Sequence, residues 1–473
     1  MSEAQSIRVE FSENRHLVLD SRIIGETVAS KLTLGEITKH PQNPLFGEDK
    51  PWEPRFDNVY ANVIYDESDE LYKCWYNPFI IDERVTSTPP EKQNPTVLNY
   101  MDAKPDHREM GLCYAVSTDG IHWEKPDLGL LEFGGNKRNN ILMRHVHGAG
   151  VFKDDRETNP ARRYKMLFCG EPQMTVAFSA DGLNWSRSIP IPEIEAHGTH
   201  ANAFWAPDLG KYVGFTRQHA RRGSDSIRQV TRTESPDFVH WTQDKFVLEG
   251  PTPRLQTHDM IVFPTCGIYL GLLGMMVHPE DSRFRVKQHV ELTWSIDTIT
   301  WNHVQAGTPL IGHSPARSET YGAMPYDWGT IFASAPVFRD NEIQLYYGAG
   351  DWYFFNWRKG YLALATLRPD GWAGYEPISA ETPGVITTTP LTFFGDTVGV
   401  TADVRNGGSV RVSILDGAGN IQAASDPITD TITDGRVKWR KSQDVVGLRG
   451  EKIRLRFQLR NAKLYSFQIR REL

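Results

Sequence analysis

The pattern of hydrophobic and polar positions repeats five times along the first three quarters of the chain. Each copy is an apolar or alternating segment, a short polar turn and an aromatic-rich segment, which is typical of a β-hairpin. The first copy runs through Ala61–Tyr65, turns at Asp66–Glu70 and continues through Leu71–Tyr76. The other four copies begin at Val151, Ala203, Ile261 and Pro336. Five such hairpins predict the inner strands of a five-bladed β-propeller.

A second repeat, Ser-x-Asp-x-x-x-Trp, follows the first four hairpins. Its copies begin at Ser117, Ser179, Ser235 and Ser295, so the steps are 62, 56 and 60 residues, about the length of a four-stranded blade. A degenerate fifth copy lies at residues 368–372. Ser and Asp side chains bond to turn amides, and Trp packs between sheets. We therefore interpret the motif as a turn device that takes no part in chemistry.

The pattern changes near residue 384. Short alternating segments at 410–415, 437–439 and 453–457 are separated by turn signals such as the one at 416–419. This spacing is typical of an antiparallel β-sandwich. We therefore expect an all-β protein with an N-terminal leader (1–50) that packs on the propeller, a five-bladed β-propeller (51–375) and a C-terminal β-sandwich (384–473).

Composition narrows the class of protein. Of 473 residues, 39% are hydrophobic, 11% aromatic and 23% charged, as in ordered globular proteins. The net charge of -7 gives no basic footprint for nucleic acid. There is neither a secretory leader pattern nor a long apolar run, so we expect a cytoplasmic protein with no membrane contact. The four cysteines are widely spaced, which favours reduced thiols over zinc ligands or disulfides.

The propeller prediction selects candidate site residues, because residues just before each inner strand converge on a central funnel. The acids at such positions are Asp57, Asp259 and Asp327, with Glu319 on the segment that leads into the fifth blade. The other candidates are Arg55, His145, His147, His197, His200, Asn202, Arg254, His258 and Trp328. Four further aspartates fall in hairpin turns, where Asp is expected for backbone reasons, and are set aside: Asp66, Asp154, Asp208 and Asp340.

Acids from different blades suggest glycoside cleavage, which needs one carboxyl group as proton donor and another as base or nucleophile. The leading hypothesis is an exo-acting glycoside hydrolase on a small or oligomeric sugar, with no cofactor. The catalytic candidates are Asp57, Asp259, Asp327 and Glu319. The substrate-binding candidates are Arg55, His147, His200, Asn202, Arg254, His258 and Trp328. A carbohydrate is the expected partner, and assembly into a homo-oligomer is left open.

The chain also resembles a known group. The stretch His40–Leu45, the segment around Asp57 and the motif at Ser117–Trp123 resemble the five-bladed glycoside hydrolases of families 32, 43 and 68. The runs at 343–348, 362–371, 408–416 and 454–468 resemble a poorly characterised bacterial group related to family 32.

The resemblance implies roles for two aspartates. Asp57 matches the first-blade nucleophile or base, and Asp259 resembles the family 43 aspartate that stabilises the transition state and orients the acid. The third blade departs from the family pattern, because His197, His200 and Asn202 stand where a catalytic Glu is expected. Asp327 and Glu319 are then the best substitutes for the general acid.

Three other functions stay open. The histidines 145, 147, 197, 200 and 258 suggest a divalent metal site of a lyase or hydrolase acting on sugar acids. Arg55, Arg254 and Arg317 suggest a phosphorylase that holds inorganic phosphate in place of water. The last alternative is a propeller that binds glycans without cleaving them.

Overall fold

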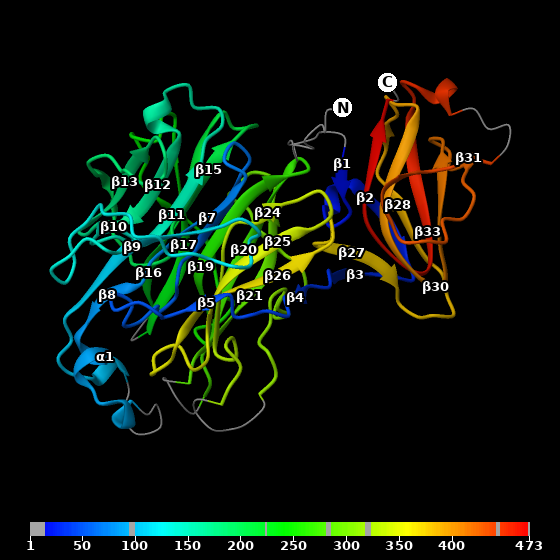
Figure 1. Cartoon of the computed structure of the whole chain (residues 1–473). Coiled ribbons are helices and arrows are strands. Elements are labelled where there is room, and N and C mark those ends of the chain that lie inside the picture. The colour runs from blue at the N-terminus through cyan, green and yellow to red at the C-terminus, as the bar shows by residue number, and fades with distance from the viewer. Residues whose placement is uncertain are drawn as a thin grey trace.

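The protein is almost entirely β-structure. The computed structural model describes residues 15–93, 100–222, 225–280, 285–316, 323–440 and 445–471. A larger body contains the strands from β4 to β26, and a smaller body beside it contains β1, β2, β28, β30 and β33 (Figure 1). The α-helix of this part of the chain is α1 (Glu83–Ser87). No helix among the described residues is long and apolar enough to cross a membrane.

Each of the five predicted hairpins forms an antiparallel strand pair. The pairs are β6 (Asn62–Asp66) with β7 (Leu71–Tyr76), β11 (His147–Lys153) with β12 (Tyr164–Cys169), β15 (Asn202–Ala206) with β16 (Lys211–Arg222), β19 (Leu255–Thr265) with β20 (Ile268–Val277), and β24 (Val337–Phe338) with β25 (Ile343–Gly350). The hairpin prediction is therefore confirmed at all five positions.

Further strands extend the first three hairpins into separate sheets. They are β8 (Phe79–Asp82), β9 (Arg108–Ser117) and β10 (Ile141–Arg144) in the first, β13 (Gln173–Ser179) and β14 (Ile189–Glu195) in the second, and β17 (Asp225–Ser235) and β18 (Lys245–Glu249) in the third. These sheets have five, four and four strands.

The last two hairpins share one sheet of ten strands. It also contains β4 (Thr38–Lys39), β5 (Phe46–Gly47), β21 (Lys287–Ser295), β22 (Asn302–His303), β23 (Thr330–Ala333) and β26 (Gly360–Leu367). Its two halves meet in a single parallel pairing between Gln288 and Thr330. Because this pairing merges the two halves by hydrogen bonding, the count of five blades stays a prediction.

The C-terminal part is another ten-stranded sheet, built on two 19-residue strands, β30 (Thr397–Leu415) and β33 (Lys452–Arg470), that pair with each other. The other strands are β1 (Arg15–Leu17), β2 (Ile24–Val28), β3 (Ser30–Leu34), β27 (Ala373–Pro377), β28 (Gly384–Thr388), β29 (Leu391–Thr392), β31 (Ile421–Ala424) and β32 (Ile432–Arg436). Two of the short alternating segments predicted here, 410–415 and 453–457, are parts of these two long strands. The β-sandwich stays a prediction.

The segment expected as a leader is divided between two sheets. Strands β1, β2 and β3 pair with C-terminal strands, whereas β4 and β5 pair with β26. Leu17 and Leu19 pack into the core of the β19–β26 sheet, and Val18 between them packs into the C-terminal core. The end of β1 and the turn that follows it therefore contribute side chains to both cores.

The Ser-x-Asp-x-x-x-Trp segments form the predicted turns. The Gly120 amide donates to Ser117 Oγ at 2.9 Å, and the amides of Ile121 and His122 donate to Asp119 Oδ1 at 2.8 Å. The copies at 179, 235 and 295 share the two amide bonds to the Asp side chain. The turn role is thus confirmed. The degenerate copy differs, because Asp370 accepts a hydrogen bond from Ser466 of β33 at 2.6 Å.

Three of the hairpin-turn aspartates hold neighbouring sheets together. Asp66 accepts a hydrogen bond from the hydroxyl of Tyr164 in the next sheet. Asp154 does the same with Tyr212 at 2.6 Å, and Asp208 with Tyr269. These side chains are therefore used in packing between sheets, which agrees with their exclusion from the candidate site.

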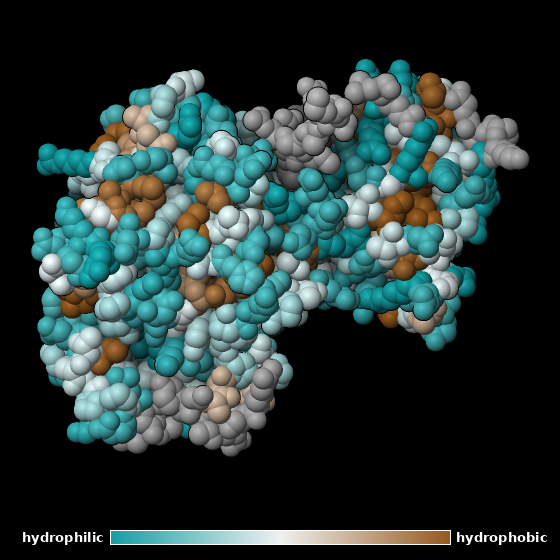
Figure 2. Space-filling model, in the orientation of Figure 1, coloured by the Kyte–Doolittle hydropathy of each residue, from teal (hydrophilic) through white to brown (hydrophobic). Residues whose placement is uncertain are grey.

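The surface agrees with a globular protein. On the face drawn in Figure 2, hydrophobic residues occur in small groups among hydrophilic ones on both bodies. Large apolar side chains are buried in several cores, such as Trp75 in the core between the first and second sheets, Trp372 in the β19–β26 core and Phe457 in the C-terminal core.

Candidate active site

A cavity of about 810 Å³ lies at the edge where the first, second and fourth inner strands begin. Its volume is typical of small-molecule sites. Of the predicted site residues, the structure brings together here Asp57, His145, His147 and His258. Aromatic side chains complete much of the wall: Tyr60, Phe79, Tyr100, Phe354 and Phe355.

Asp57 lies in the loop before β6, on a strained stretch of backbone. Its φ is 50°, and Val59 and Tyr60 have φ of 65° and 44°. Positive φ is rare for non-glycine residues and is a true outlier for a β-branched one, and such strain is concentrated at functional sites. The Asp57 side chain is 21% exposed, so the loop presents a largely buried carboxylate to the cavity.

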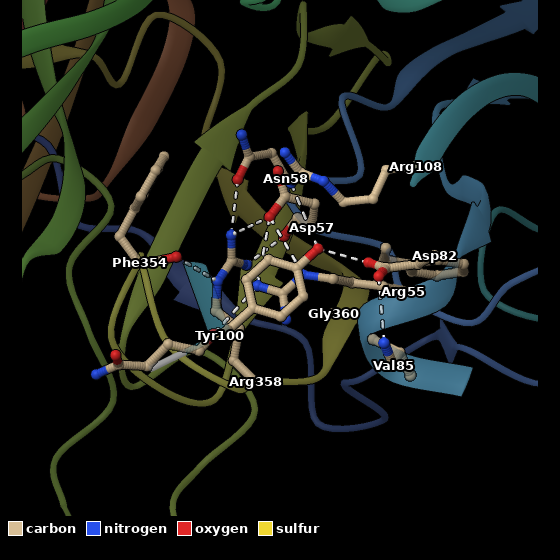
Figure 3. Close-up of polar contacts among 12 residues, drawn as sticks. Arg55, Asp57, Asn58, Asp82, Val85, Tyr100, Arg108, Phe354, Arg358 and Gly360 are labelled. Carbon is tan, nitrogen blue, oxygen red and sulfur yellow. Dashed lines mark hydrogen bonds and ion pairs between the residues drawn. The ribbon is translucent and has the colours of Figure 1, made fainter. Parts of the chain in front are cut away.

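Two buried arginines hold the Asp57 carboxylate (Figure 3). Arg358 Nη2 donates to Asp57 Oδ1 at 3.0 Å, and Arg55 Nε and Nη2 donate to the same oxygen at 3.4 Å. Burial by itself would raise the pKa of Asp57, but Arg358, Arg55 and Arg108 outweigh it and the pKa is lowered. Asp57 is therefore ionised at neutral pH, which suits a base or nucleophile and not a proton donor.

Arg55 is itself fixed from several sides. Its guanidinium lies 3.7 Å from the ring centroid of Tyr100, and its Nη2 donates to the Asn356 carbonyl at 3.1 Å. Tyr100 in turn donates to Asp82 at 2.5 Å (Figure 3). Arg55 does not line the cavity, so the structure places it beneath Asp57 as a positioning group and not against a substrate.

Three of the predicted histidines surround one tyrosine. The Tyr60 ring centroid lies 5.9 Å from that of His147, 5.3 Å from His200 and 6.4 Å from His258. Burial lowers the pKa of all three, to about 4 for His147 and His200. They are neutral near pH 7, so each ring has one donor and one acceptor nitrogen. His147 and His258 line the cavity, whereas His200 lies behind Tyr60.

The other two histidines lie apart. His145 is at the rim with a 77% exposed side chain, and His197 packs against His219 at 5.5 Å between ring centroids. Within the described ranges, no group of three or more His, Cys, Asp or Glu side chains is placed to hold a metal ion. The five histidines predicted as metal ligands thus do not converge on one point, because the packing of the sheets puts Tyr60 between three of them.

Asp259 is buried behind His258. Its Oδ1 lies 3.0 Å from His258 Nδ1 and accepts from Gln288 Nε2 at 3.3 Å, and its buried Oδ2 has no hydrogen-bond partner. Burial raises the pKa of Asp259 to about 7. Asp259 is not among the residues lining the cavity, but it contacts His258 and acts electrostatically on Arg217, both of which line it.

The described candidates that were expected in a fifth blade, Asp327 and Trp328, lie outside the cavity. Asp327 is fully buried, with Lys39 Nζ at 2.5 Å and the Tyr347 hydroxyl at 3.1 Å. Trp328 stacks on Trp352, with ring centroids 5.0 Å apart. The sequence pattern did not predict that β4, from near the start of the chain, pairs with β26. This pairing brings Lys39 to Asp327. The loop after β25 reaches the cavity instead, through Phe354 and Phe355.

The remaining predicted residues do not line the cavity either. Arg254 has a 53% exposed side chain and pairs with Glu280 at 2.6 Å. Asn202 Oδ1 accepts from the Val262 amide at 2.9 Å and so joins two neighbouring sheets. Glu319 and Arg317 lie outside the described residues.

Several lining residues were not predicted from the sequence. They are Arg108 and Glu109 on β9, Glu171 just after β12, and Arg217 and Arg228 on β16 and β17. The sequence rule considered only residues before inner strands, whereas this cavity is also lined by the strands next to them. Applying the rule to the far end of each inner hairpin would have found Glu171.

The acids of the cavity differ in their partners. Glu109 accepts from Arg144 Nε at 2.6 Å, and Asp106 from Lys104 at 2.7 Å. Glu171 is exposed and, within the described part of the chain, has no ion pair. Of the described lining acids, Asp57 is therefore fixed by buried arginines and Glu171 is free to meet a ligand.

Comparisons with known proteins give remote likenesses. No family model and no curated protein matches the chain. A solved N-acetylgalactosamine deacetylase from F. plautii, in complex with blood group B trisaccharide, is 13% identical with a TM-score of 0.44, over 72% of this chain and 96% of that one. A structure described under the GH130 family of mannoside phosphorylases is 16% identical with a TM-score of 0.46, over 73% and 97%. A fructofuranosidase from Schwanniomyces occidentalis is 9% identical with a TM-score of 0.43, over 90% and 97%. The function is therefore inferred from the site itself.

Proposed function

We propose that this protein is a glycoside hydrolase whose cavity binds a small or oligomeric sugar and whose ionised carboxylate is Asp57. The observation that carries the proposal is the Asp57 carboxylate, held by Arg358 and Arg55 on a strained loop at the cavity. A carboxylate kept charged in a largely buried position is what a base or nucleophile of glycoside cleavage requires.

The second carboxyl group is Glu171. It lines the same cavity from a different sheet, is exposed, and forms no ion pair among the residues described, so its carboxyl group is open to a substrate. In the reaction, the leaving glycosidic oxygen takes the proton of Glu171 as its bond to the anomeric carbon breaks. The oxygen of water forms the new bond to that carbon, and its proton ends on Asp57 or, after a covalent ester intermediate, on Glu171.

The rest of the cavity suits a carbohydrate. Tyr60, Phe79 and the two phenylalanines of the loop after β25 offer aromatic surfaces, on which the C–H faces of sugars pack. Neutral His147 and His258 offer both donors and acceptors to hydroxyl groups. These features support a sugar-binding cavity with polar and aromatic sides.

The test is a screen of 4-nitrophenyl glycosides and oligosaccharides, followed by kinetics of Asp57→Asn on any substrate cleaved. We expect kcat/KM to fall by about 10³-fold or more, as for loss of a nucleophile or base. Asn tolerates the left-handed backbone of this position, so the variant is expected to fold. Asp340→Asn, an exposed acid in a hairpin turn, is the matched control with unchanged kinetics.

Chemical rescue separates a chemical role from a structural one. Asp57→Gly keeps the positive φ without strain and leaves space for a small anion. Added azide or formate should restore part of the activity by replacing the carboxylate. Full activity of Asp57→Asn, or wild-type protein that cleaves no glycoside in the screen, would contradict the proposal.

A further inference from the structure

Two arginines of the third sheet meet at the cavity wall. Arg217 lies on β16 and Arg228 on β17. The register pairs Arg217 with Val230 and His219 with Arg228. Residues directly opposite in a strand pair, and residues two apart along a strand, project to the same face. Arg217 and Arg228 are therefore diagonal neighbours on one face, and both line the cavity.

Neither arginine has an anionic partner. Arg217 is 9% exposed, and its Nη2 donates to the Gly198 carbonyl at 2.7 Å. The Nε atoms of Arg217 and Arg228 are both buried without a hydrogen-bond partner. Across the described ranges, no ion pair involves either side chain, whereas Arg358 of the same site pairs with Asp57.

No acid of the surroundings pairs with either arginine, although Asp259 is close enough to act on Arg217 electrostatically. The facing side chains His197 and His219 have pKa values lowered by burial, to about 4 for His219, and are neutral at pH 7. The nearby Asp259 is bonded to His258 and Gln288 instead. Placing a buried and a half-buried positive charge side by side without an ion-pair partner is unfavourable, and an anion that pairs with both relieves this cost.

We propose that Arg217 and Arg228 bind an oxyanion, and that this group is a carboxylate, sulfate or phosphate carried by the sugar substrate. Guanidinium groups match such oxyanions in shape and donate paired hydrogen bonds to them. This inference rests on the proposed glycoside cleavage. It narrows the substrate of that reaction to sugars that carry a carboxylate, a sulfate or a phosphate group. Free inorganic phosphate has the same chemistry, and the test below distinguishes the two sources.

Binding is measured without turnover, by calorimetry and thermal shift of the full chain. The probes are D-glucuronate, inorganic sulfate and inorganic phosphate, with D-glucose as neutral control and sodium chloride to hold ionic strength constant. We expect saturable binding of at least one oxyanion. The Kd should weaken about tenfold to a hundredfold in Arg217→Met and in Arg228→Met, the range for losing a charged hydrogen bond.

Three further variants control for the fold and for the catalytic proposal. Arg411→Met, at an exposed arginine of β30, should bind the probes as wild type does. Arg228→Lys keeps the charge and should keep part of the affinity. Arg217→Met removes a buried charge and Arg228→Met a half-buried charge, each without an ion-pair partner, so the Tm of both variants without ligand should equal or exceed that of wild type. A clear loss of Tm in both would assign these arginines to the fold and overturn the inference.

Turnover then identifies the source of the oxyanion. Cleavage of acidic or sulfated glycosides in phosphate-free buffer places the group on the sugar. If cleavage instead requires phosphate, a phosphate oxygen bonds to the anomeric carbon, the leaving oxygen takes the Glu171 proton and a sugar phosphate is released. The oxyanion site then stands, with free phosphate as its source.

The two proposals fail in different ways. Oxyanion binding to wild type and to Asp57→Asn without any glycoside cleavage would end the proposed function and leave the anion site standing. Cleavage of neutral glycosides with no oxyanion binding, or with Kd values unchanged in Arg217→Met and Arg228→Met, would overturn the anion site and leave the function standing.

Discussion

Asp57 and Asp327 both pair with basic side chains, yet only Asp57 lies at the cavity. Arg358 and Arg55 hold Asp57 from beneath, and its remaining surface faces the cavity. Lys39 and Tyr347 enclose Asp327, whose side chain has no exposed surface. Both residues precede an inner strand and were equal candidates in the sequence. The comparison shows that a buried aspartate with a basic partner is a site candidate only when part of its carboxylate faces a cavity that a ligand can enter.

The largest effect expected from this comparison is on stability, in Lys39→Met. This change leaves the fully buried Asp327 carboxylate without its cation, and breaking a buried pair in this way costs about 3–5 kcal/mol. Asp327→Asn should cost less, because Lys39 is 23% exposed and can turn to water. Urea unfolding of the two variants at pH 7 measures the difference.

Kinetics of the same variants test whether Asp327 is separate from the chemistry. At a temperature where Asp327→Asn is folded, its kcat/KM should equal that of wild type. A loss comparable to that of Asp57→Asn would return Asp327 to the active site and remove the distinction drawn above.

The next effect is catalytic, in Glu171→Gln. We expect kcat to fall by about 10²- to 10⁴-fold, the range for loss of a general acid. The free energy of unfolding should not change, because the side chain is exposed and has no ion pair in the described part of the chain. Glycosides with a good leaving group, such as dinitrophenolate, need little protonation and should recover much of the rate. An equal loss on all leaving groups would argue against the proton-donor role.

A smaller effect concerns the pH dependence set by Arg358. Since Arg358 is the strongest influence lowering the pKa of Asp57 against burial, Arg358→Met should raise that pKa by about 1–3 units. Asp57 must be ionised to act, so the acidic limb of the kcat/KM profile should move to higher pH by the same amount. Arg358→Lys keeps the charge and should shift the limb less. An unmoved limb in both variants would mean that another group titrates there.

The smallest effect is the contribution of Asp259 to stability. Its folded pKa of about 7 exceeds the unfolded value of about 3.9, so the folded state binds more protons between these pH values. The free energy of unfolding should therefore fall as pH rises through this window, by at most about 1.4 kcal/mol per pH unit from this group. Asp259→Asn should remove that part of the slope. Urea unfolding at pH 5 and 7 measures it, and equal slopes in both proteins would contradict the raised pKa.

The sequence by itself determined the local features of this protein. The hairpins follow from the alternation of hydrophobic and polar residues, and the Ser-x-Asp turns from side chains that bond amides two or three positions away. Both features can therefore be predicted from short segments of sequence. The position of Asp57 before an inner strand also follows from this regularity.

Only the tertiary structure decided which of the predicted groups share a cavity. Lys39 reaches Asp327 because β4 pairs with β26, Tyr60 stands between histidines of three sheets, and Arg217 and Arg228 become neighbours through the register of β16 and β17. Each of these contacts joins segments whose approach depends on how strands pair and sheets pack. Side-chain periodicity reports which face of a strand is buried, but it carries no information about which distant residue that face meets.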